Sequence, residues 1–106
     1  MTTTTTTIGG HDVHVDDEGF LTSYDEWDEE LARALAAQIG LELTTEHLSV
    51  LRFLRQDFRE HGETATLRRV TVGTGVPTRQ LFALFPVKPA KKMAYVAGLP
   101  KPRGCV

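Results

Sequence analysis

The fold class of this chain is decided by residues 44–62, whose sequence is TTEHLSVLRFLRQDFREHG. Apolar side chains recur in it three or four positions apart, which is the spacing of one helix face. That stripe contains Leu48, Leu51, Leu54 and Phe58, with Val50 and Phe53 on its flank. Thr44 or Thr45 can cap the beginning, and Gly62 suits a left-handed C-cap. The segment predicts an amphipathic helix that buries one side against other elements.

Similar patterns predict four further helices, one before this segment and three after it. The first is expected at about residues 25–38, where Ser23 and Glu26 have the spacing of a capping box. The others are expected at about residues 64–72, from Pro77 or Thr78 to Phe85, and at residues 90–97 between Pro89 and Gly98. We expect Phe53, Phe58, Phe82 and Phe85 to fill the core.

The two ends of the chain have different patterns. Residues 13–15 and 20–22 are β-prone and flank an acidic turn, which predicts a short N-terminal β-hairpin. The threonine-rich residues 1–11 are expected to be disordered. Prolines predict an extended arm over residues 98–106. The predicted fold is mainly α, a small domain over residues 12–97 with about five orthogonally packed helices, the hairpin in front and the arm behind.

Length and composition limit the class of protein. The chain has 106 residues, 41% of them apolar, which is enough for one modest core. No apolar run approaches the ~20 residues that cross a bilayer, and the N-terminus lacks the basic and apolar regions of a signal peptide. We therefore expect a cytoplasmic protein with no membrane partner. A single cysteine cannot form an internal disulfide, so a reduced thiol is its expected state.

Charge is separated along the chain. Residues 1–63 hold all 14 acidic side chains and only four arginines, whereas the rest of the chain holds eight cations and no acid. Two interpretations remain open. The two halves can pack side by side, or a basic surface near the C-terminus can meet an anionic partner, which would be nucleic acid or an acidic protein cleft.

The only cysteine, Cys105, stands one residue before the C-terminus. A segment with Pro100, Pro102 and Gly104 is poorly suited to a core, so this thiol is placed for access rather than burial. The cations of Lys101 and Arg103 favour the thiolate, while the terminal carboxylate opposes it. A tethered arm of this kind lets the thiol reach other proteins. Its residues are Gly98, Pro100, Lys101, Pro102, Arg103, Gly104 and Cys105.

Three segments together resemble the DsrC/TusE family of sulfur-relay proteins. They are AGLPKPRGCV at residues 97–106, LFALFP at residues 81–86 and LTTEHLSVLRFLR at residues 43–55. The resemblance extends from about residue 12 to the end. It implies a helical domain with a mobile C-terminal arm whose penultimate cysteine, here Cys105, carries sulfane sulfur as a persulfide.

The resemblance also implies partners and a mode of action. The two-cysteine members have a second arm cysteine at the position of Ala94, and this chain is similar instead to the single-cysteine, TusE-like members. Those accept persulfide sulfur from an upstream donor protein and pass it to a tRNA thiouridylase that makes 2-thiouridine, which implies indirect proximity to tRNA. We expect a sulfurtransferase-type carrier rather than a free-standing enzyme, without cofactor. An alternative is a single-cysteine, DsrC-like partner of a sulfite reductase or sulfur-oxidation complex.

Other patterns favour different chemistry less strongly. Residues 67–85 have the outline of a helix-turn-helix with Arg79 near the start of its second helix, so nucleic-acid binding is a further alternative. His11 and His14 would point to opposite faces of an extended segment and lack a third ligand, so we expect no metal site. His47 and His61 are expected to be solvated. The acidic run at residues 25–30 indicates helix capping rather than paired catalytic carboxylates.

Overall fold

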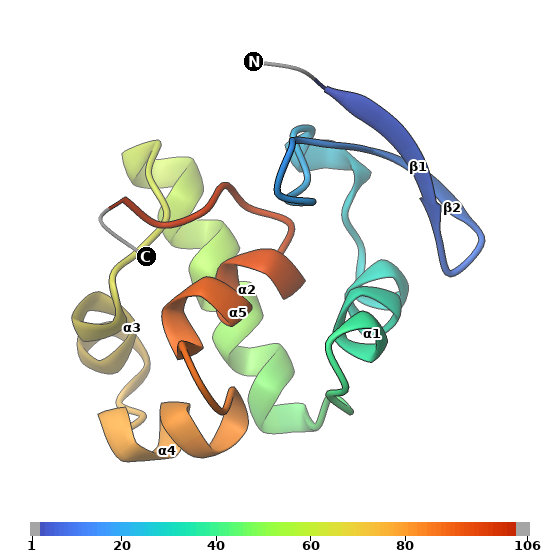
Figure 1. Ribbon diagram of the computed structural model, residues 1–106. Helices are drawn as coiled ribbons and strands as arrows, with labels where there is room; N and C mark the ends of the chain where they lie inside the picture. The colour runs from blue at the N-terminus through green and yellow to red at the C-terminus, as the bar shows by residue number, and fades with distance from the viewer. Residues whose placement is uncertain (1–2, 104–106) are drawn as a thin grey trace.

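The computed structural model describes residues 3–103 (Figure 1). Its strands are β1 (Thr4–Ile8) and β2 (His11–Val15), followed by a 3-10 turn, Tyr24–Glu26. Its helices are α1 (Glu29–Gln38), α2 (Thr45–His61), α3 (Leu67–Thr74), α4 (Thr78–Leu84) and α5 (Pro89–Val96). The prediction of a mainly helical domain with five helices and an N-terminal hairpin is confirmed. No helix within residues 3–103 combines the length and apolar character needed to span a bilayer.

Helix α2 is the central element and has the predicted bounds. Thr44 is its N-cap and accepts a hydrogen bond from the backbone of His47, whose imidazole accepts one from the Thr44 N–H at 3.0 Å. Since Nδ1 accepts there, Nε2 carries the proton and donates to the carbonyl of Leu84 at 2.7 Å. The prediction that His47 is solvated is wrong, because this capping role and the bond to α4 bury it to 6% exposure.

The core lies between α2 and the other helices. Its fully buried side chains include Leu51, Leu54, Val70, Leu81, Phe85, Met93, Val96 and Leu99. The prediction that Phe85 is a core residue is confirmed. Phe53 and Phe58 pack against the core as partly buried residues. Phe82 is 47% exposed, so its prediction as a core residue is wrong. One step along α4 from the buried Leu81 rotates a side chain by about 100°, which turns Phe82 outward.

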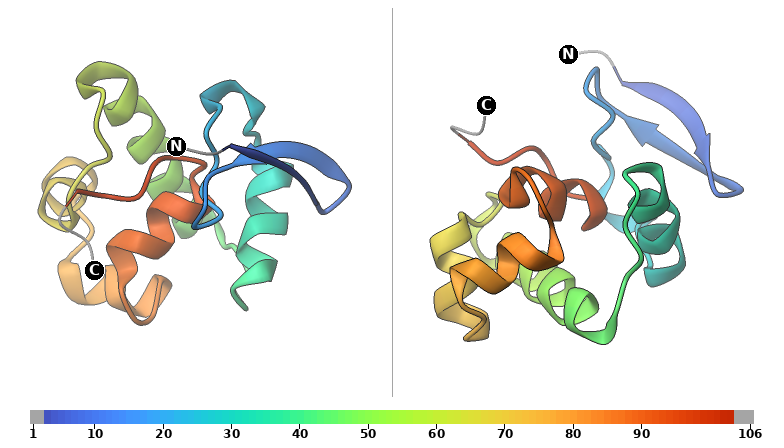
Figure 2. Two further views of the ribbon diagram at one scale, coloured as in Figure 1. Left: turned by 45° about the horizontal axis from the view of Figure 1, so that its top comes forward. Right: turned by 60° about the horizontal axis from the view of Figure 1, so that its bottom comes forward.

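The hairpin differs from the prediction in its first strand. The prediction of disorder for residues 1–11 is wrong where β1 pairs antiparallel with β2, with Thr4 opposite Val15 and Ile8 opposite His11. Gly9 and Gly10 have φ of 57° and 84°, the left-handed conformations that a two-residue hairpin turn needs. The expected partner of β2, residues 20–22, contributes one bridge from Leu21 to Val15. Figure 2 shows the hairpin on the side of α1, away from α3 and α4.

Two predicted helix starts move by a few residues. α1 begins at Glu29 because Asp28 is its N-cap and accepts a hydrogen bond from the Leu31 N–H at 2.7 Å, whereas Ser23 makes no capping bond. α3 begins at Leu67 after the N-cap Thr66 and continues to Thr74. In both cases the helix begins after the residue whose side chain accepts hydrogen bonds from the free N–H groups of the first turn. Several nearby residues are chemically able to act as this N-cap, so the sequence alone does not decide between them.

Candidate functional site: the base of the C-terminal arm

The arm starts where α5 ends. Ala97 is the C-cap of α5, and Gly98 follows with φ of 70°, as the predicted helix end requires. A Cβ atom at position 98 would lie 2.5 Å from Cδ1 of Trp27. Real Cβ contacts are never this short, so the direction in which the arm leaves the body depends on glycine at this position.

Two side chains bond the last turn of α5, Trp27 and Arg55, and the ring of Tyr24 lies against Arg55. We call these three residues the arm clamp. Arg55 donates from Nη1 to the carbonyl of Ala97 at 2.9 Å and from Nη2 to the carbonyl of Tyr24 at 2.7 Å. Trp27 donates from Nε1 to the carbonyl of Val96 at 2.8 Å. The bonds to Val96 and Ala97 satisfy carbonyls that the end of α5 leaves without an internal partner. The arm therefore begins from a fixed base.

The guanidinium of Arg55 lies between two aromatic rings of the clamp. Its Cζ is 3.8 Å from the centroid of the Tyr24 ring and 4.4 Å from that of the Trp27 ring. Burial lowers the pKa of Arg55, but an arginine remains protonated at physiological pH. Each such cation–π contact contributes about 0.5–2 kcal/mol. No local spacing predicts this group, because Tyr24 and Trp27 at the 3-10 turn are about thirty positions from Arg55 on α2.

Beyond the clamp, the described part of the arm lies along the body. Leu99 is fully buried in the core, and Pro102 is also buried. Thr64 donates from its hydroxyl to the carbonyl of Pro100 at 2.7 Å. In Figure 1 the red segment crosses over α2 toward the connection between α2 and α3, where Thr64 lies. Residues 99–103 contain no helix or strand, in keeping with the predicted effect of the prolines.

Two exposed ion pairs add to this contact. Lys101 Nζ lies 3.2 Å from a carboxylate oxygen of Glu18, and Arg103 Nη1 lies 3.7 Å from one of Glu63. The side chains of Arg103 and Glu63 are 91% and 65% exposed. Solvent-exposed pairs of this kind contribute about 0–1 kcal/mol each. Lys101 and Arg103, predicted as docking or thiolate-stabilising charges, thus engage acidic residues of the N-terminal half.

The predicted sulfur-carrying residue lies outside the described residues, as does Gly104. Arg103, the last described residue, stands two positions before Cys105 in the sequence. The role of Cys105 therefore remains a prediction, and what the described residues contribute is the base from which the arm starts.

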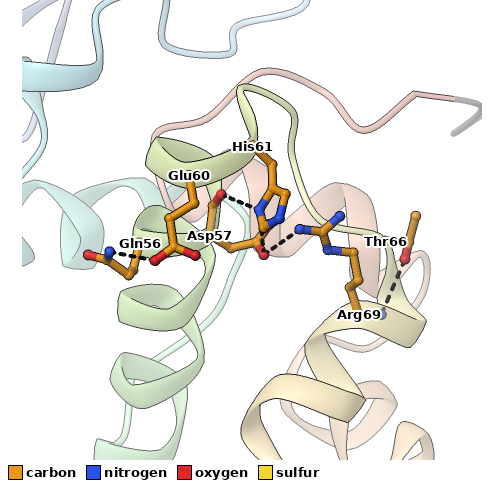
Figure 3. A network of polar contacts seen from close by, with 6 residues as sticks. All are labelled: Gln56, Asp57, Glu60, His61, Thr66 and Arg69. Carbon is orange, nitrogen blue, oxygen red and sulfur yellow. Dashed lines mark hydrogen bonds and ion pairs between the residues drawn. The ribbon is translucent and has the colours of Figure 1, made fainter.

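The surface that receives the arm is braced by a buried carboxylate (Figure 3). Asp57 on α2 accepts from Arg69 Nη2 on α3 at 2.7 Å and lies 3.3 Å from Nδ1 of His61. It is 7% exposed, and its Oδ2 has no hydrogen-bond partner in the described part of the chain. The imidazole of His61 is exposed, as predicted, and also bonds the Asp57 carbonyl. This network joins α2 to α3 and so positions the connection that contains Thr64.

Remaining predicted residues lie apart from the arm. His11 and His14 approach Glu30 and Glu26 on or before α1, and within residues 3–103 no three potential metal ligands come together. Partial burial raises the pKa of Glu26, but hydrogen bonds from the backbone and ring of His14 outweigh this and lower it. Arg79 is exposed at the start of α4, and its predicted contact with nucleic acid stays a prediction.

The fold and this site define a class: a small helical domain that holds the base of a C-terminal peptide arm in a fixed clamp. A family model described as "DsrC like protein" matches residues 7–106, and the chain belongs to this family. Sulfurtransferase TusE of Salmonella typhimurium is 36% identical over 104 residues, covering 92% of this chain and 95% of the relative. The gamma subunit of dissimilatory-type sulfite reductase of Nitratidesulfovibrio vulgaris is 32% identical over 101 residues, covering 94% and 96%. The NMR structure of Allochromatium vinosum DsrC matches with a TM-score of 0.83 at 35% identity, covering 99% of this chain and 100% of that one.

Proposed function

We propose that this protein is a sulfur-relay carrier that receives sulfane sulfur on Cys105 and passes it to an acceptor protein. The observation that carries the proposal is the combination of a single cysteine in the penultimate position with an arm whose base is clamped. The printed names of the relatives, sulfurtransferase TusE and DsrC, support the same chemistry.

The proposed transfer balances without an external oxidant. The Cys105 thiolate attacks the outer sulfur of a donor persulfide, a new S–S bond forms, and the donor cysteine leaves as a thiolate. An acceptor thiolate then attacks the outer sulfur of the Cys105 persulfide, and Cys105 leaves as a thiolate. The sulfane sulfur keeps its oxidation state in both steps. Lys101 and Arg103 are proposed to favour the thiolate or to contact the partner when they leave Glu18 and Glu63.

Alanine at position 94 favours a simple carrier over an internal redox cycle. Ala94 is fully buried in α5 and stands where the resemblance places the second cysteine of the two-cysteine members. Without that thiol, Cys105 cannot close a disulfide within the chain. A persulfide on Cys105 also has no second thiol in the same chain that would release its sulfur early.

Within this function, we favour delivery to the enzyme that makes 2-thiouridine in tRNA. The single cysteine supports this assignment, and the gamma-subunit relative keeps partnership with a sulfite reductase or sulfur-oxidation complex as the alternative. The partners would be a persulfide donor protein and a tRNA thiouridylase, with indirect proximity to tRNA. A reduced thiol suits the cytoplasm.

Mass spectrometry after incubation with a cysteine desulfurase and cysteine tests the carrier function. The C-terminal peptide of the wild-type protein is expected to gain the mass of one sulfur atom, and the Cys105→Ser variant is expected to gain none. Absence of added sulfur on that peptide, or equal labelling of the variant, would overturn the proposal. The loaded protein is then offered separately to a tRNA thiouridylase with tRNA and to a dissimilatory sulfite reductase. Loss of sulfur to only one of them identifies the pathway.

A further inference from the structure

A second feature of the surface is a cavity between the N-terminal end of α5, the C-terminal end of α1 and the turn before Phe20. It has a volume of about 440 Å³. Its lining includes Phe20, Ile39, Val87, Lys88, Lys91 and Tyr95. The residues of the arm clamp do not line it, so the cavity is separate from the base of the arm.

The cavity is basic. Lys88, Lys91 and Lys92 all line it, and none of them forms an ion pair with a carboxylate in residues 3–103. Lys92 donates to the carbonyl of Pro86, which keeps its charge at the rim. The only acidic residue in the lining is Glu18, which already pairs with Lys101 of the arm. The positive charge of the basic half of the chain is therefore uncompensated at this cavity. In the arm, by contrast, Lys101 and Arg103 are paired with Glu18 and Glu63.

The cavity also has an apolar wall. The ring of Phe20 packs edge-on against that of Tyr95 with centroids 5.7 Å apart. Val87 stands at the rim with 70% of its surface exposed and a φ of 61°, which is unusual for a β-branched residue. Burial raises the pKa of Tyr95, so its hydroxyl keeps its proton and is able to donate to a carboxylate.

These features differ from those of a phosphate-binding surface. A nucleic-acid backbone is tracked by a stripe of cations along an open surface. Here the cations surround a hollow of side-chain size with aromatic walls, while the exposed Arg68 and Arg79 lie on α3 and α4 and do not line it. Lysines around an aromatic hollow suit a partner segment that inserts one apolar side chain into the hollow and places carboxylates on either side of it.

We propose that this lysine-lined cavity docks an acidic segment of a relay partner protein, with one apolar or aromatic side chain inserted beside Phe20 and Tyr95. The proposal rests on the carrier function proposed above and names the kind of partner surface involved. It also couples docking to the arm. Carboxylates of the docked segment would lie near Glu18 and offer Lys101 other partners, which weakens one of the contacts between the arm and the body.

The first test measures binding of defined peptides by NMR titration of the full chain. An EEWEE peptide is expected to bind and to shift the amide signals of Phe20, Ile39 and Tyr95 most, while KKWKK and EEGEE are expected to bind at least about tenfold more weakly. The variant with Lys88→Glu and Lys91→Glu should lose about tenfold or more in affinity for EEWEE.

A matched control separates this site from general electrostatic attraction. The variant with Arg68→Glu and Arg79→Glu has the same change in net charge away from the cavity, and its affinity is expected to stay within about twofold of wild type. Equal losses in both variants, or largest shifts elsewhere, would overturn the proposal. Tighter binding of a short RNA hairpin at the same residues would assign the cavity to nucleic acid instead. Lysine-dependent self-association in sedimentation would assign it to a second copy of the chain.

Two further readouts complete the test. EEWEE is expected to raise the amide exchange rates of residues 99–103, and no change there would overturn the coupling. Loading of Cys105 by glutathione persulfide, a small donor that needs no docking, should be the same in the Lys88→Glu, Lys91→Glu variant and in wild type. If neither wild type nor the Lys88→Glu, Lys91→Glu variant is loaded by glutathione persulfide, the carrier function fails while the docking result stands. If both are loaded but wild type does not bind EEWEE, only the docking proposal fails.

Discussion

The indole of Trp27 occupies the space that any side chain at Gly98 would need. The two residues are far apart in the sequence, yet a Cβ atom at position 98 would lie 2.5 Å from Trp27 Cδ1. The same indole donates to the carbonyl of Val96. One aromatic side chain therefore sets both where α5 ends and the direction in which the arm leaves.

Replacement of that glycine tests this relationship. Gly98→Ala is expected to destabilise the protein by more than the ~1–2 kcal/mol that the left-handed conformation alone costs, because Trp27 must also move. Gly62→Ala is the matched control, since Gly62 ends α2 with φ of 72° and no neighbouring atom lies within 4 Å of the place that an added Cβ would take. Urea unfolding measures both. Equal losses would show that Trp27 does not restrict position 98.

Arg55 is expected to be the strongest contributor in the arm clamp. Arg55→Ala removes the donors to Ala97 and Tyr24. It leaves the partly buried Ala97 carbonyl unpaired, at about 1–3 kcal/mol, and leaves the Tyr24 carbonyl only the long bond from the Trp27 N–H at 3.5 Å. Arg55→Lys should recover only part of the loss, because an ammonium cannot supply the same planar pair of donors. Arg59→Ala, an exposed change on the same helix, should stay within about 0.5 kcal/mol in urea unfolding. A loss no larger than that of Arg59→Ala would contradict the role of Arg55.

Thr64→Val tests the contact between the body and the arm beyond the clamp. The change keeps the shape of the side chain and removes the hydroxyl that donates to Pro100. We expect a loss of about 0.5–1.5 kcal/mol and faster amide exchange over residues 99–103, measured by NMR. Thr78→Val, whose hydroxyl contacts Thr71 away from the arm, is the control and should leave that exchange unchanged. Unaltered exchange in Thr64→Val would mean that other contacts hold the arm.

The pair of Glu26 and His14 predicts a pH dependence at the acid side. Hydrogen bonds from His14 lower the pKa of Glu26 in the folded state below the ordinary value of about 4.3. A carboxyl group with a lowered pKa in the folded state stabilises the fold at pH values above its pKa in the unfolded chain. This stabilisation is lost as the pH falls through the pKa of the group in the folded protein. Glu26→Gln should therefore be less stable than wild type at neutral pH, with the difference narrowing below about pH 4.3. Urea unfolding at several pH values measures this, with the exposed Glu42→Gln as control, and a constant difference would contradict it.

Much of the fold was predictable because helix signals are local. The bounds of α2 follow from Thr44, Gly62 and an apolar stripe between them, and α4 and α5 begin and end at prolines and a glycine as predicted. Strand β1 was harder to predict from its threonines. Only Ile8 of this strand is buried, so its sequence lacks the alternation of apolar and polar residues that indicates a strand. Its pairing depends on β2, and the Gly9-Gly10 turn was the signal that indicated it.

For the candidate site, the sequence alone determined which reactive and charged groups are present: one thiol at position 105, prolines and cations in the segment before it, and acidic and basic halves of the chain. Tertiary structure alone decided how the arm is held. Arg55 reaches Ala97 across 42 positions and Trp27 reaches Val96 across 69. Hydrogen bonds act over about 3 Å, so which donor meets which carbonyl depends on how the helices pack, and no local spacing in the sequence encodes that distance.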